Sequence, residues 1–242
     1  MKKILIYLFL FLVTPICYAQ LTSSEYLNLG IKEVEIKNFE KAIDYLTQFL
    51  DSDPQNAVAR FNRAFAYYSL QQFEPALQDA TDAVTSNPQY TFALNLRGLI
   101  YTSMQMYSNA ILDFNSAIFS NPDFAEAYLN RAVVYKLQNQ YAEAISDLNN
   151  SLNINPALIE AYLIRGEVLV SMANYNDAIK DLTTYISNIQ NKAAAYAARG
   201  LAYYQMGNYV NAVTDLEKAI QLKPEMERDF SIVLTDAKNK QK

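Results

Sequence analysis

Few side chains in this 242-residue chain have the chemistry of a catalytic centre. The sequence contains no histidine, and its one cysteine, Cys17, lies near the N-terminus, so Ser-His-Asp and Cys-His catalysis lack their residues. Glu160 and Glu167 are the nearest candidate pair for the carboxylate chemistry that cleaves glycosides. On one helix they would lie about 10 Å apart, which is the long limit for that reaction. We therefore expect no enzyme activity, no cofactor and no metal.

A second set of charged residues recurs at a fixed spacing. In five places an arginine is followed, sixteen residues later, by an aspartate. The pairs are Arg63 with Asp79, Arg97 with Asp113, Arg131 with Asp147, Arg165 with Asp181, and Arg199 with Asp215. At the equivalent places further upstream, Leu29 and Tyr45 replace both members together. This joint change predicts a structural ion pair within each repeat, and it disfavours the alternative that the arginines bind an anionic ligand.

These spacings belong to a repeat of 34 residues. Proline recurs at that step, with Gln190 in place of the fifth one. The units run over residues 23–56, 57–90, 91–124, 125–158, 159–192 and 193–226. In all six units the twentieth place is alanine, the seventeenth is Phe or Tyr, and the eighth is Gly or Ala. A small eighth residue predicts that a second helix approaches the first closely.

The sixth unit carries the most complete motif of small and large residues. Its residues are Tyr196, Gly200, Tyr203, Tyr209, Ala212, Ala219 and Pro224. This motif resembles the tetratricopeptide repeat (TPR), and the resemblance covers residues 23–226. It implies an all-α fold, a right-handed superhelical solenoid of six helix-turn-helix repeats with a concave groove. The content of 51% hydrophobic residues, with few glycines and prolines, also favours a helical protein with a sizeable core.

Two further features lie in the C-terminal half of the chain. Residues 227–242 place Phe230, Val233, Leu234 and Ala237 on one helical face, which predicts a capping helix. Unit five departs from the pattern at Gln190 and also at Tyr185, which stands where three other units have alanine. We expect the helix there to run on, and the junction between units five and six to be looser or differently angled.

The resemblance implies that the groove is lined by the second, fifth, ninth and twelfth places of each first helix. The candidate partner-binding residues at these places are Leu27, Ile31, Val34, Phe61, Phe65, Tyr68, Phe92, Asn95, Leu99, Leu129, Lys136, Glu160 and Glu167. They change from apolar in the first three units to partly acidic in the later ones. Two interpretations stay open: a recognition surface, or packing between neighbouring first helices.

A protein partner follows from the same residues. Tetratricopeptide grooves that bind chaperone tails use a carboxylate clamp of Lys, Asn and Arg at set places. That clamp is absent here, because Leu27, Ile31 and Val58 occupy those places. We expect a scaffold that binds an apolar helix or extended peptide bearing a basic residue. A self-assembling subunit of an envelope or secretion complex is the alternative, and a glycan-binding or glycan-cleaving module is a distant one. Nucleic acid is not expected, since the processed chain would have 18 basic and 25 acidic residues.

Residues 1–19 have the pattern of a secretory signal peptide. Lys2 and Lys3 precede an apolar run over residues 4–13, and Ala19 is small, as signal peptidase requires. We predict cleavage before Gln20 and a periplasmic or secreted protein of the bacterial envelope, with no stable membrane insertion afterwards. A retained membrane anchor would need about 20 apolar residues, more than this run provides. Acylation of Cys17 is a weak alternative, because a bulky isoleucine precedes it.

Overall fold

The computed structural model describes residues 21–241, and the predicted signal peptide lies outside this range. Within it the chain forms thirteen α-helices and one short 3₁₀ helix, with no strand. The fold is therefore all-α, as the composition predicted.

Twelve of the helices form six consecutive pairs, and each pair falls within one 34-residue unit. The pairs are α1 (Ser23–Glu35) with α2 (Phe39–Ser52), α3 (Ala57–Ser69) with α4 (Phe73–Ser86), α5 (Thr91–Ser103) with α6 (Tyr107–Ser120), α7 (Ala125–Leu137) with α8 (Tyr141–Ile154), α9 (Ile159–Ser171) with α10 (Tyr175–Asn188), and α11 (Ala193–Gln205) with α12 (Tyr209–Leu222). The 3₁₀ helix η1 (Pro224–Met226) and α13 (Glu227–Lys240) follow. This is the predicted solenoid with its additional C-terminal helix.

Each pair turns at one residue with left-handed backbone geometry. The fifteenth place of every unit has a φ between 58° and 75°, and only the sixth unit uses a glycine there, Gly207. The left-handed residue ends the first helix and reverses the chain within a few residues. The two helices of a pair therefore lie antiparallel and in contact over their length.

The small residue at the eighth place allows this close contact. A Cβ atom added at Gly98 would lie 2.6 Å from Cε1 of Phe114, whose side chain is fully buried in the same unit. Gly30 and Gly166 are equally close to Leu46 and Leu182. The predicted close approach of the second helix is thus confirmed.

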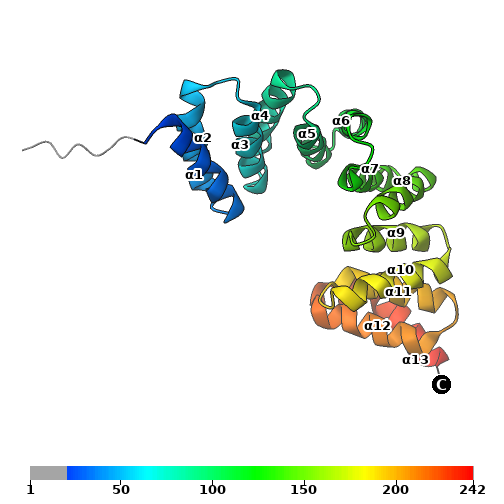
Figure 1. Ribbon diagram of the computed structural model, residues 1–242. Coiled ribbons are helices and arrows are strands. Elements are labelled where there is room, and N and C mark those ends of the chain that lie inside the picture. Colours follow the sequence, from blue (N-terminus) through cyan, green and yellow to red (C-terminus); the bar gives the residue numbers. More distant parts are fainter. Residues whose placement is uncertain (1–20, 242) are drawn as a thin grey trace, which may run out of the picture.

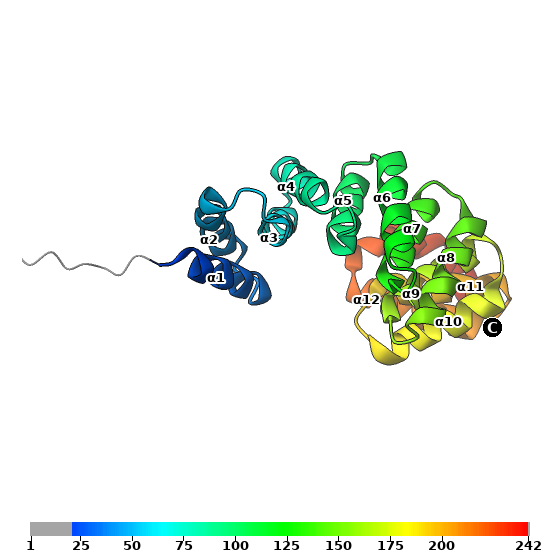
Figure 2. The same ribbon diagram turned by 45° about the horizontal axis from the view of Figure 1, so that its top comes forward.

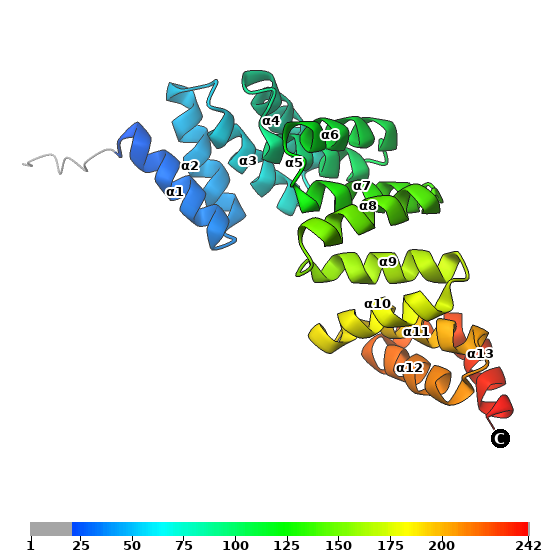
Figure 3. The ribbon, with the colours of Figure 1, turned by 45° about the vertical axis from the view of Figure 1, so that its right-hand side comes forward.

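Successive pairs stack into a curved solenoid (Figure 1). The first helices α3, α5 and α7 follow the inner side of the curve, and α4, α6 and α8 follow its outer side. The turned view of Figure 2 shows that the stack also winds out of the plane of Figure 1, and Figure 3 shows α1 at one end and α13 at the other. Small clusters of buried residues join each unit to the next, so the core is continuous along the stack.

Unit five differs from our expectation. Helix α10 ends at Asn188 and has the same 14 residues as the other second helices, so the prediction that it runs on is wrong. Tyr185 is 1% exposed and belongs to a large buried cluster, which also contains Leu163 and Ala195 of the flanking first helices. The larger side chain fills the junction between units five and six. The packing therefore gives no support to a looser junction.

The first unit presents a polar surface at its end of the stack, and α13 covers the last pair at the other end. In units two to six the third and tenth places are buried apolar residues, several of which pack against the preceding unit. Unit one has Glu25 and Lys32 at these places, and both are exposed. At the other end, α13 covers α12 through Leu234 and the fully buried Ala237.

The capping helix is also held by polar contacts. The Tyr204 hydroxyl of α11 donates to Asp236 at 2.5 Å, and Lys238 forms an ion pair with Glu217 of α12 at 2.7 Å. Among residues 21–241 no helix combines the length and apolar character needed to cross a membrane.

Candidate functional site

The repeated arginine and aspartate form two-pronged ion pairs within each unit. In all five pairs Nε of the arginine donates to one carboxylate oxygen at 2.6–2.7 Å, and Nη2 donates to the other at 2.7–2.9 Å. The aspartates are buried, with 2–7% of each residue exposed. The predicted pairing within units is confirmed, and its role is to join the two helices of a pair.

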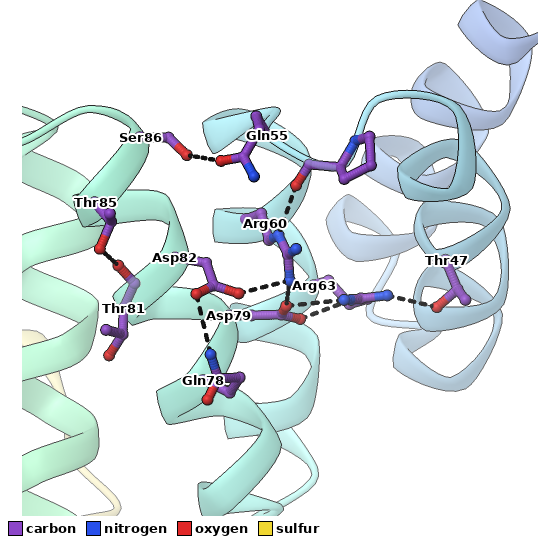
Figure 4. A network of polar contacts seen from close by, with 11 residues as sticks. Thr47, Gln55, Arg60, Arg63, Gln78, Asp79, Thr81, Asp82, Thr85 and Ser86 are labelled. Atoms are coloured by element: carbon purple, nitrogen blue, oxygen red, sulfur yellow. Dashed lines mark hydrogen bonds and ion pairs between the residues drawn. The ribbon is translucent and has the colours of Figure 1, made fainter.

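The same arginines also reach the preceding unit. Nη1 of Arg63 donates to Oγ1 of Thr47 at 3.0 Å, and Arg60 adds a second ion pair to Asp79 at 2.8 Å (Figure 4). Arg131, Arg165 and Arg199 make the equivalent contacts to Asn115, Asn149 and Thr183. With their donors engaged in this way, these guanidinium groups are poorly suited to hold an anionic ligand.

The electrostatics of the pairs agree with this structural role. For Arg97, Arg131, Arg165 and Arg199, the hydrogen bonds that the guanidinium donates to its partner aspartate raise the pKa of the arginine above its ordinary value. Partial burial lowers the pKa of each group, but by less. Each arginine therefore stays charged and paired.

The predicted groove residues lie on one face of the first helices, which we call the first-helix face. Leu27, Ile31, Val34, Phe61, Tyr68, Asn95, Leu99, Leu129, Lys136 and Glu167 are half-buried, whereas Phe65, Phe92 and Glu160 are exposed. Contacts between successive first helices account for part of the burial; the Asn130 amide, for example, donates to Asn95 at 2.9 Å. The first-helix face thus combines packing with accessible side chains.

Four rings make an aromatic row along the N-terminal ends of α3, α5 and α7. The ring centres of Phe61 and Tyr90 are 5.3 Å apart, those of Tyr90 and Phe92 are 6.3 Å apart, and those of Phe92 and Phe124 are 5.3 Å apart. Their tilted and edge-to-face angles are those that aromatic pairs prefer. Burial within this row raises the pKa of Tyr90. The row fixes the orientation of its most exposed member, Phe92.

Three apolar side chains of the first-helix face remain accessible in spite of these contacts. Val58 is 45% exposed, Phe65 is 37% exposed and Phe92 is 57% exposed. Phe65 packs edge-to-face on Phe39 of α2, with the ring centres 6.2 Å apart. All three side chains belong to α3 and α5, in units two and three.

The later units have a different first-helix face. Lys136 of α7 forms a short ion pair with Glu167 of α9, so this predicted acidic residue is neutralised. Glu160 is exposed and accepts a hydrogen bond from the Tyr185 hydroxyl at 3.3 Å. Burial, followed by the charge of Glu160, raises the pKa of Tyr185 to about 12. The free acidic character of this half comes from Glu126 and Glu160, both of which are exposed.

Three residues of this site were missed by the sequence analysis. Tyr90 and Phe124 stand at the last place of their units, just before α5 and α7, so a search confined to the first helices passes over them. The aromatic pair at the same place in two successive units was the available signal. Tyr185 contacts the first-helix face from α10, and nothing in the repeat pattern indicates that this side chain points toward the first helices.

Residues 21–241 contain no group of three or more acidic residues placed to hold a metal ion. The site therefore consists of an apolar and aromatic surface, a row of structural ion pairs and a few exposed carboxylates. A stack of paired helices with such an inner surface defines the class of helical-repeat interaction scaffolds.

Family models identify the repeat. One model described as tetratricopeptide repeat matches residues 125–158 and 193–226, which are units four and six as bounded from the sequence. A second model with the same description matches residues 27–91. Together they match more than half of the chain, which therefore belongs to the tetratricopeptide-repeat family. Proteins built from these repeats are in general interaction modules without catalytic activity.

Solved structures share the fold. PilF of Pseudomonas aeruginosa is 17% identical with a TM-score of 0.73, over 90% of this chain and 96% of that one. A tetratricopeptide-repeat protein from Parabacteroides merdae is 24% identical with a TM-score of 0.66, over 91% and 86%. YrrB, described as having an unusual peptide-binding site, is 21% identical with a TM-score of 0.62, over 80% and 97%. No curated protein sequence matches the chain.

Proposed function

We propose that this protein is a non-enzymatic adaptor that holds a peptide or helix of a partner protein against the first-helix face. The observation that carries the proposal is the exposure of Phe65 and Phe92 within an otherwise packed aromatic surface. Exposed aromatic side chains on a rigid support are typical binding anchors, because little conformational entropy is lost when a partner covers them.

The proposed partner is an apolar segment with a basic residue. Units two and three supply the apolar anchors, and Glu126 and Glu160 supply exposed carboxylates in the two units that follow. A basic side chain placed after the apolar residues would meet these carboxylates. The peptide-binding site named for YrrB supports such a mode by analogy of fold alone.

Selection from a random peptide library on the immobilised protein tests this proposal. We expect the enriched peptides to combine large apolar residues with lysine or arginine. Their affinity should fall at least about ten-fold in the Phe65→Ser and Phe92→Ser double variant, since both anchors are lost. Val210→Ser is the control, because this valine is an apolar residue that is 62% exposed on the second helix α12, away from the first-helix face. Equal binding by the double variant would refute the proposed site.

Assembly by end-to-end stacking is less well supported. A continuing stack would bury Glu25 and Lys32 of α1, where later units have alanine or another apolar residue. Burying these charges without partners would be costly. The N-terminal end of the solenoid therefore favours an adaptor over a filament-forming subunit.

We further propose that the adaptor works outside the cytoplasm, on the basis of the pattern in residues 1–19. Mass spectrometry of the protein isolated from its own host should find an N-terminus at Gln20, because Ala19 is the small residue that signal peptidase would recognise. Fractionation of the same cells should place the processed chain in the periplasm or the medium. An intact N-terminus beginning at Met1 would contradict export by this route.

A further inference from the structure

The outer helix α6 carries an apolar patch that the other units lack. Leu112 is 63% exposed and Phe119 is 88% exposed. They occupy the twenty-second and twenty-ninth places of unit three. The other five units have only polar residues there, namely Asp44, Gln78, Ser146, Lys180 and Thr214 at the first place and Asp51, Thr85, Asn153, Ser187 and Gln221 at the second. Packing of the repeat therefore does not require the two apolar side chains.

Helix α6 itself presents no exposed charge. Helix α6 has one charged residue, Asp113, which is 5% exposed and held by Arg97. Its exposed polar residues include Asn115 and Ser116, which lie between the two apolar ones. A hollow lies beside the patch, lined by Leu112, Phe119 and the loop residue Pro88. Depletion of charge around an exposed aromatic residue is typical of the centre of a protein interface.

We infer that this α6 patch is the contact surface for a second copy of the same chain, in a weak two-fold dimer. In such a contact each group faces its own copy, so a charged patch would repel itself. The chain carries a formal net charge of −5, and α6 offers an extended uncharged face on which two copies can meet without that cost. Charge thus favours self-association at α6 over contact elsewhere.

The geometry of α6 fits an antiparallel pair. Leu112 and Phe119 are seven residues apart, which is two helical turns or about 10 Å. With the two-fold axis near Ser116, Phe119 of each copy meets Leu112 of the other and enters the hollow beside it. The small serine at the axis allows the helices to approach closely. Each copy therefore supplies both the protruding ring and the hollow that receives it.

The dimer is weak because the patch is small. One helix face with two apolar side chains buries less than the roughly 1,200 Å² of a stable specific interface. Because α6 lies on the outer side of the curve, pairing would leave α3 and α5 free (Figure 1). Two first-helix faces would then be joined in one particle, which raises the avidity for a partner that carries two copies of the bound segment.

Sedimentation equilibrium of the purified protein tests this inference over concentrations from about 1 µM to about 1 mM, the range of weak interfaces. We expect a monomer–dimer equilibrium, and at least a ten-fold weaker dimer for Phe119→Asp. The control Asn153→Asp adds the same charge at the same place of unit four, where the side chain is also exposed, and should leave the equilibrium unchanged. A chain that stays monomeric throughout, leaving the patch for a different protein, or a dimer unaffected by Phe119→Asp, would overturn the inference.

A cysteine at the expected axis gives an independent test. In a Cys17→Ser background, which removes the natural thiol, Ser116→Cys should form a disulfide-linked dimer on mild oxidation. The cysteine of Asn150→Cys, at the equivalent place of unit four, should remain unlinked. Equal cross-linking of both variants would show random collision rather than pairing through α6. Neither test depends on peptide binding, so its outcome is separate from that of the proposed adaptor function.

Discussion

Replacement of Asp147 by alanine is expected to destabilise the protein by about 3 kcal/mol. The change leaves a charged Arg131 in the seam between α7 and α8 without its carboxylate partner. The aspartate side chain is 5% exposed and that of the arginine is 17% exposed, with 2.7 Å from Nη2 to the carboxylate. For a chain of this size such a loss lowers the melting temperature by roughly 10 °C. The measurement is thermal unfolding followed by circular dichroism.

Two controls separate the pair from general effects. Asp177→Ala removes an aspartate whose side chain is 52% exposed, and should cost less than about 0.5 kcal/mol. The double change of Arg131→Met with Asp147→Leu removes both charges from the seam and should cost less than Asp147→Ala alone. Equal losses for the single and double variants would contradict a buried ion pair.

Gly98→Ala is expected to destabilise the protein by about 1–3 kcal/mol, although alanine is the better helix former. The added Cβ would lie 2.6 Å from the ring of Phe114, which is fully buried, so the ring or one of the two helices must shift. Chemical denaturation gives the free energy of unfolding. Overpacking between α5 and α6 is the physical cause of the loss.

The protein contains its own control for this contact. In unit four the equivalent residues are Ala132 and Leu148, both fully buried. Combining Gly98→Ala with Phe114→Leu reproduces that pair in unit three, so the double variant should regain much of the stability lost by Gly98→Ala. If the two changes were simply additive, the small residue at the eighth place would have some other role than close packing.

Prediction from the sequence succeeded where equivalent positions of the six units could be compared with one another. Arginine and aspartate change together in unit one, and this alone predicted the pairing that the structure shows in the other units. The proline step gave unit boundaries that each enclose one helix pair. Six copies of one unit place every residue in six related environments, so a departure from the pattern is informative.

Predictions from the position of a residue in the repeat failed where its side chain packs against a neighbouring unit. The departures at Gln190 and Tyr185 predicted a looser or differently angled junction, but the structure buries Tyr185 between α9 and α11, where its size fills space. Tyr90 and Phe124 join the aromatic row from the turns before their helices. Contacts of this kind depend on the angle between successive units, which a 34-residue pattern does not specify.

The first-helix face shows the same limit. The sequence placed apolar residues there, yet it left open whether they bind a partner or pack between repeats. Both interpretations apply, to different residues. Leu27 and Val34 pack against the buried cluster of unit one, and Leu129 packs against that of unit four. Val58, Phe65 and Phe92 stay exposed and form the surface that we propose for binding.

Hydrogen–deuterium exchange with and without a library-selected peptide tests the proposed binding surface most directly. We expect the peptide to slow amide exchange in α3, α5 and the first turn of α7, where Phe65, Phe92 and Glu126 lie, and to leave the outer helices α4 and α6 unchanged. Protection confined to the outer helices, or to α9 to α13, would contradict the proposal that this scaffold holds its partner on the first-helix face.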